Sequence, residues 1–205
     1  MSFRIAVLVS GEGSNLQALI DDLRDSDVEI AGVASSRADA RGLQRAETAG
    51  IGTRVFSLAD EPERAKRDDA LAAWLEERGV ELVVLAGFME LLTPGFIRRF
   101  AGRIVNVHPA LLPAFPGLGA IEQALEHGVK VAGVTVHFVD EGVDSGPILL
   151  QEAFELPYHR DISAIRQHFH EVEHRLLPRA VRLIAAGRVS LDPDDPRVVR
   201  VESDG

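Results

Sequence analysis

Asn106 and His108 stand two residues apart, directly before a loop that contains Pro109, Pro113 and Pro116. Side chains two apart in a β-strand project to the same side, so these two can act on one ligand atom if their segment is a strand. An amide N–H group and an imidazole can together stabilise an oxygen atom that gains negative charge, as in acyl transfer through a tetrahedral intermediate. The competing interpretation is that both side chains only satisfy backbone groups at a strand end.

Asp144 is a candidate third member of this site. It lies in the polar segment VDEGVDSGP, after an alternating segment that carries Thr135 and His137. An ionised carboxylate raises the pKa of a nearby histidine, so a charged His108 could stabilise the oxyanion and then protonate the leaving amine. The alternative is a solvated turn in which Asp144 only faces water. For His137 a buried histidine with a satisfied ring is the default.

The chain offers no side chain for a covalent intermediate. It has no cysteine and no serine in a nucleophile elbow, so the attacking group is expected to come from the substrate. The lack of cysteine also excludes disulfides and thiolate metal sites. The spacing of His170 and His174 can bind zinc, but a solvated helix face is the commoner reason for it, and we expect no metal site.

A glycine-rich segment, SGEGSNLQA, follows the first apolar run and precedes a helical pattern. Gly13 allows a tight turn, and the amides of Gly13, Ser14 and Asn15 would then face an anion over the start of the helix. A capping box between Ser14 and Gln17 would explain the same segment without a ligand. Leu16 replaces the third glycine of the dinucleotide motif and no acidic residue ends the second strand, so a mononucleotide-like phosphate fits better than NAD.

The apolar patterning predicts how these segments are positioned. Short apolar runs alternate with helical patterns, which indicates an α/β fold with a doubly wound, mostly parallel sheet. Ligands bind beyond the carboxyl ends of the strands in such sheets, where Asn106 and His108 are expected. Two strands joined by a short polar turn predict an antiparallel C-terminal excursion. The expected strands are Arg4–Ser10, Ile30–Ser36, Thr53–Ser57, Glu81–Gly87, Arg103–His108, Val129–Val139 and Pro147–Leu156, and the expected helices are Ser14–Arg24, Gly42–Ala49, Glu63–Arg78, Thr93–Phe100, Ile121–His127 and Asp161–Gly187.

Length and composition indicate one domain over residues 1–189, followed by a polar tail over residues 190–205. The chain has 205 residues, and 46% of them are hydrophobic, which is enough to build a core. We expect the last helix to be kinked at Pro178 and the tail to be partly disordered.

The net charge of −10 argues against nucleic-acid and anionic-membrane partners, because both require a basic face. No run approaches the ~18 apolar residues of a membrane span, and the N-terminal segment lacks the basic region of a signal peptide. We therefore expect a cytoplasmic protein that acts on small molecules. Whether it forms a homodimer is left open.

Four motifs resemble those of the folate-dependent glycinamide ribonucleotide formyltransferases of purine synthesis, and the resemblance extends from about Arg4 to Gly187. The Asn-x-His-Pro motif with its Leu-Leu-Pro is shared by the formyl transferases that use 10-formyltetrahydrofolate, whereas the Ser-Gly-x-Gly-Ser-Asn-Leu opening points to the purine enzyme. The resemblance implies a phosphate-binding half over about 1–102 and a folate and catalytic half over about 103–189. In chain order the motifs are SGEGSNLQALI, LAGFMELLTPGFI, NVHPALLPAFPG and TVHFVDEGVDSGPILLQ.

The resemblance also implies residue roles in formyl transfer from 10-formyltetrahydrofolate to the substrate amine. Asn106 and His108 stabilise the attacked formyl oxygen, His108 donates a proton, and Asp144 pairs with His108. Thr135 supports a water in this relay, and His137 is a second supporting residue. The substrate phosphate is assigned to Gly13, Ser14 and Asn15, the ribose hydroxyls to Glu173, and the folate to Arg64, Phe88, Met89, Glu90, Leu91, Leu92, Val139, Asp140, Glu141 and Val143.

Two positions depart from the pattern of the family. Glu90 stands where some relatives have arginine, and Gly119 stands where some have histidine; we assign no role to position 119. Transfer to transfer RNA would need a further nucleic-acid-binding domain, and a formyltetrahydrofolate hydrolase would carry an extra N-terminal domain, so neither is expected. Two alternatives remain, namely a formyltransferase for a sugar-nucleotide amine and a non-catalytic α/β module that binds a nucleotide phosphate.

Overall fold

The computed structural model describes residues 2–157, 161–195 and 197–202. They form two compact units, Met1–Asn106 and Val107–Gly205. Strand β5 (Ile104–His108) contributes its first three residues to the first unit and its last two to the second.

The first unit is built on parallel strands in the order β3-β2-β1-β4-β5. The side chains from Ile5 to Val9 are fully buried and those of β4 are buried, which explains why these strands read as continuous apolar runs. The bounds are β1 Phe3–Val9, β2 Val28–Ser35, β3 Thr53–Val55 and β4 Leu82–Leu85.

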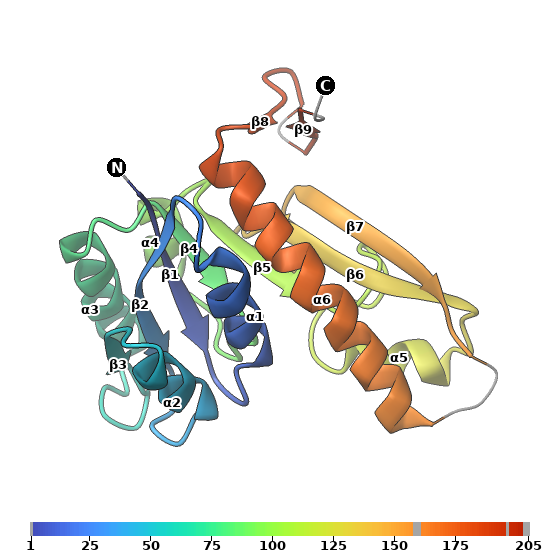
Figure 1. Cartoon of the computed structure of the whole chain (residues 1–205), viewed down its shortest axis with the longest axis horizontal. Coiled ribbons are helices and arrows are strands. Elements are labelled where there is room, and N and C mark those ends of the chain that lie inside the picture. Colours follow the sequence, from blue (N-terminus) through green and yellow to red (C-terminus); the bar gives the residue numbers. More distant parts are fainter. Residues whose placement is uncertain (1, 158–160, 196, 203–205) are drawn as a thin grey trace. The chain divides into compact units, whose positions relative to one another are not determined.

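The helices of the first unit form two packed pairs, α1 with α2 and α3 with α4 (Figure 1). From β1 the chain steps outward through β2 and β3 and then returns to β4 and β5, so right-handed crossovers place the two helix pairs on opposite faces of the sheet. The expected doubly wound arrangement is therefore confirmed. The bounds are α1 Ser14–Leu23, α2 Arg41–Thr48, α3 Arg64–Glu77 and α4 Pro94–Arg99.

The second unit pairs β6 (Val131–Phe138) with β7 (Ile148–Glu155) in antiparallel fashion, which confirms the predicted excursion. Helix α6 (Ile162–Ala185) packs on both strands and passes through Pro178 as one helix. Asp161 starts it by accepting hydrogen bonds from the amides of Ser163 and Ala164. The short helix α5 (Ala120–Glu126) precedes β6.

The C-terminal segment contains more structure than the sequence predicted. Strands β8 (Val189–Leu191) and β9 (Val199–Val201) pair in antiparallel fashion. Three residues of the tail, those of β9, thus have a regular partner, where the sequence predicted no strand. Positions 196 and 203–205 lie outside the described residues. Within the described ranges, no helix is both long and apolar enough to cross a membrane.

Candidate active site

The centre of the candidate site is one carboxylate that faces two imidazoles. Oδ2 of Asp144 lies 3.4 Å from Nδ1 of His108, and Oδ1 lies 3.5 Å from Nε2 of His137. The amide of Gly117 donates to Oδ2 at 2.7 Å. Both histidines are buried and the Asp144 side chain is 14% exposed, so this charge is largely shielded from water.

Backbone carbonyls determine where the protons of both rings lie. Nε2 of His108 lies 2.8 Å from the carbonyl oxygen of Phe115, and Nδ1 of His137 lies 2.8 Å from that of Phe138. A carbonyl only accepts, so these outer nitrogens carry protons. The nitrogen that faces Asp144 therefore carries a proton only when its ring is an imidazolium.

The carboxylate of Asp144 is held in its ionised form. Burial acts to raise its pKa, but the hydrogen bond from His137, the amide of Gly117 and the charge of His108 outweigh burial and lower the pKa below its ordinary value. The predicted pairing of Asp144 with His108 is present, and the solvated-turn alternative does not describe this residue.

The backbone is strained at two residues of this cluster. Within the described chain, Phe115 and Asp144 are the non-glycine residues with positive φ, at 52° and 50°. The Phe115 carbonyl contacts His108, and the Asp144 carboxylate faces His108 and His137. Such conformations persist only where surrounding contacts enforce them, and they concentrate at functional sites.

Thr135 fastens the proline loop to β6. Its hydroxyl donates to the carbonyl of Ala110 at 2.7 Å and accepts from the amide of Leu112 at 3.1 Å and from Gln151 at 2.9 Å. The residue is completely buried. These partners use the hydroxyl proton and both lone pairs, so the hydroxyl of Thr135 holds the proline loop in place.

Asn106 and His108 both lie in β5, as the sequence predicted, and their side chains leave this strand on the same side. Asn106 is half-buried and its residue pairs in register with Leu85 of β4. Strand β5 ends at His108, because Pro109 cannot donate to a further ladder bond.

The glycine-rich loop of the first unit begins α1 without a side-chain cap. Gly13 is the N-cap residue, with φ 70° and ψ 31°, and Ser14 is already the first helical residue. The capping-box alternative is therefore not what begins this helix: the Gln17 side chain bonds to Asp21 at 3.0 Å. A side chain at position 13 would approach the Cα of Gly42 to 2.6 Å, so close packing against α2 fixes this start.

The residues assigned to folate lie in three segments. Phe88, Met89, Glu90, Leu91 and Leu92 follow β4 in the first unit, where Met89 and Leu91 are exposed. Arg64 is the exposed first residue of α3. Val139, Asp140, Glu141 and Val143 follow β6 in the second unit, where Asp140 accepts from the amide of Gly142 and from Ser145. Glu173 is buried on α6.

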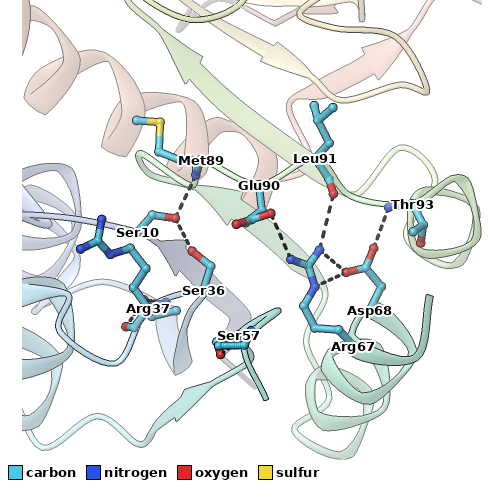
Figure 2. Close-up of polar contacts among 12 residues, drawn as sticks. Ser10, Ser36, Arg37, Ser57, Arg67, Asp68, Met89, Glu90, Leu91 and Thr93 are labelled. Carbon is cyan, nitrogen blue, oxygen red and sulfur yellow. Dashed lines mark hydrogen bonds and ion pairs between the residues drawn. The ribbon is translucent and has the colours of Figure 1, made fainter. Parts of the chain in front are cut away.

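Sequence reasoning missed Arg67, which is buried in the first unit beside the loop after β4 (Figure 2). Its Nε and Nη2 atoms donate to Oδ1 of Asp68 at 2.8 and 2.5 Å, and Oδ2 of Asp68 accepts from the amide of Thr93 at 2.6 Å. Oε2 of Glu90 lies 3.5 Å from Nη1. The available signal was its spacing from Leu71 and Trp74, which places a charge on the buried face of α3.

Comparisons with known proteins indicate the family of the chain. The formyl transferase family profile matches residues 3–181. The trifunctional purine biosynthetic protein adenosine-3 of Drosophila pseudoobscura pseudoobscura is 48% identical over 90% of this chain, which spans 14% of that protein's length. Phosphoribosylglycinamide formyltransferase of Haemophilus influenzae is 42% identical over 92% of this chain and 90% of its own.

A solved structure extends the likeness to the fold. Glycinamide ribonucleotide transformylase 1 from Symbiobacterium toebii aligns with a TM-score of 0.94 and 48% identity, covering 98% of this chain and 95% of its own. The profile match covers most of the chain and includes both the glycine-rich loop and His108. The chain belongs to the formyl transferase family.

Proposed function

We propose that this protein transfers a formyl group from 10-formyltetrahydrofolate to the amine of glycinamide ribonucleotide, in de novo purine biosynthesis. The observation that carries the proposal is the pairing of His108 with Asp144, at the end of the strand that also bears Asn106. Relatives named for this reaction cover nearly the whole chain. The non-catalytic binding module leaves this pair as a coincidence.

The reaction follows from the chemistry of these groups. The substrate amine attacks the formyl carbon, and the formyl oxygen becomes an alkoxide that the Asn106 amide and His108 stabilise. When the intermediate collapses, the bond from carbon to the folate nitrogen breaks and that nitrogen receives a proton from His108. The attacking nitrogen gives up one proton, which returns to His108. The products are the formylated amide and tetrahydrofolate. Asp144 stays ionised and compensates the charge of the imidazolium.

Both substrates are assigned to sites that the residues fit. The uncapped first turn of α1 presents the amides of Ser14 and Asn15 to the substrate phosphate, and no acidic side chain lies in that turn. Glu173 would accept from the ribose hydroxyls. The exposed apolar Met89 and Leu91 suit the folate body, with Arg64 and the segment Val139–Val143 contributing further contacts. The cytoplasmic location stays a prediction.

A direct assay tests the proposal. The protein is mixed with glycinamide ribonucleotide and 10-formyltetrahydrofolate, and release of deformylated folate is followed. Release with a sugar-nucleotide amine but not with glycinamide ribonucleotide would overturn the substrate assignment. Asn106→Ala should reduce turnover by ~10²–10³-fold, as loss of an oxyanion donor does, and leave phosphate affinity unchanged. Binding of both ligands without any turnover would instead support the binding module.

A further inference from the structure

Arg67 is a buried cation whose charge is compensated by its neighbour in the chain. It is 1% exposed, and Asp68 accepts from two of its nitrogens. Asp68 is equally buried and is held in place by the amide of Thr93. A buried arginine with such a partner needs no second carboxylate to balance its charge.

One nitrogen of Arg67 nevertheless lacks a hydrogen bond. Nη1 is buried and has no hydrogen-bond partner, and Oε2 of Glu90, at 3.5 Å, is too distant to be a good acceptor. A buried donor left unsatisfied is unfavourable, and more so when the group is charged. The first unit therefore holds a buried donor, Nη1 of Arg67, that can bind an anion. The Glu90 carboxylate lies over it without a good hydrogen bond.

The Glu90 side chain, which lies over Nη1 of Arg67, is able to move away. The Glu90 side chain is 30% exposed, and Figure 2 shows it directed at Arg67 while the side chains of Met89 and Leu91 point away from Arg67. Met89 and Leu91 are 66% and 60% exposed. The same short loop thus joins an apolar surface to a carboxylate that lies over a buried guanidinium.

We propose that Glu90 is a displaceable stand-in and that a ligand carboxylate replaces it at Nη1 of Arg67. The ligand class is an apolar or aromatic body that ends in a carboxylate; under the function proposed above, on which this inference rests, it is the anionic tail of the folate co-substrate. The exchange conserves the charge around Arg67, moves Glu90 into water and gives Nη1 an acceptor. Arg67 then selects ligands that carry a charged tail.

A fixed Glu90 would have a different effect. If it stays over Arg67, it repels every second carboxylate, and Arg67 takes no part in binding. Both arrangements predict tighter tail binding when Glu90 loses its charge. Only displacement predicts that this gain depends on Arg67, so the two variants must be combined.

The experiment measures binding of pteroylglutamate and of its neutral tail diamide by calorimetry. Glu90→Gln should tighten binding of pteroylglutamate by about tenfold if Glu90 covers Arg67 about nine-tenths of the time, and should leave the diamide unchanged. Adding Arg67→Lys to Glu90→Gln should abolish the gain, because a lysine ammonium cannot present the Nη1 donor. Glu77→Gln, an exposed charge on α3, is the matched control and should change neither ligand.

Three outcomes would overturn the inference. They are a gain that survives Arg67→Lys, an equal gain for the diamide, or the same gain in Glu77→Gln. If the Arg67→Lys chains do not fold, a crystal structure of Glu90→Gln with pteroylglutamate decides, since a tail carboxylate directed away from Nη1 contradicts the exchange. Formyl transfer is assayed in parallel: its absence in the unaltered protein defeats the proposed function, whereas normal transfer with an Arg67-independent tail preference defeats only this inference.

Discussion

The carbonyl oxygen of Phe115 lies 2.8 Å from Nε2 of His108, and this contact turns the other ring nitrogen toward Asp144. Phe115 takes up a left-handed backbone conformation at the position where it offers that carbonyl. The imidazole is thus oriented by main-chain geometry and by one carboxylate. A site organised in this way should respond to substitutions as a unit.

His108→Ala and Asp144→Asn should therefore not have additive effects on kcat. Each single change is expected to lower kcat by ~10²–10⁴-fold, the range typical of a lost acid–base group. The double variant should be hardly slower than His108→Ala alone, because the carboxylate acts through the ring. Single-turnover kinetics at saturating substrates make the measurement. Losses that multiply would show that Asp144 acts independently of His108.

The stability of the fold should depend on pH through Asp144. Its pKa in the folded chain is lowered from the ordinary value of 3.8, so its ionised form contributes stability that is fully present above that value. This contribution is lost as the pH falls through the lower folded pKa. Urea unfolding at a series of pH values should show wild type more stable than Asp144→Asn at neutral pH, with a difference that shrinks below pH ~4. A difference that is constant down to acid pH would contradict the assignment.

Thr135 offers a test of how the proline loop is held. Thr135→Val keeps the shape but leaves the amide of Leu112 and the carbonyl of Ala110 without their partner, and should lower the free energy of unfolding by ~2–4 kcal/mol. Thr135→Ser keeps the hydroxyl and should lose much less. Denaturant titration compares them. Equal stability of the two variants, together with slower turnover in both, would favour a role in binding water instead.

Gly13 and Gly11 form a matched pair for the phosphate loop. Gly13→Ala puts a methyl group against Gly42 in a left-handed conformation and should destabilise the protein by more than ~1 kcal/mol while weakening substrate affinity. A side chain at Gly11 meets nothing within 4 Å, so Gly11→Ala should fold normally. Thermal unfolding and calorimetric binding of glycinamide ribonucleotide follow both effects. Similar losses at both positions would argue against the specific packing of Gly13.

Much of the fold could be predicted because its strands and helices have local patterns. The run from Ile5 to Val9 is apolar because both faces of β1 are covered, and Thr93 with Pro94 begins α4 as expected. Ser14 and Gln17 show the limit of such patterns. They satisfy the capping-box spacing, but the close approach of Gly13 to Gly42, far along the chain, decides where the helix starts.

The candidate site was predictable where the resemblance named residues, and less so where side chains meet across the fold. The default for His137 was half correct, since a backbone carbonyl does satisfy Nδ1, but its Nε2 faces Asp144. Arg67 looked like one more charge in a charged helix. Asp68 is its neighbour in α3, but Glu90 and Thr93, which contact Arg67 and Asp68, lie on the segment after β4, so the contacts of Arg67 could not be read from the helix alone.

The ratio of two imidazoles to one carboxylate limits how many protons the cluster can handle. With Asp144 ionised, the three side chains together are neutral when one ring is an imidazolium. They carry one positive charge when both rings are imidazolium ions. In the proposed reaction the incoming amine surrenders one proton and the departing folate nitrogen gains one, so the overall exchange with bulk water is nil. Such a reaction requires a group that donates one proton and then regains it. The single carboxylate of Asp144 balances the charge of one imidazolium, which matches the one proton that is exchanged.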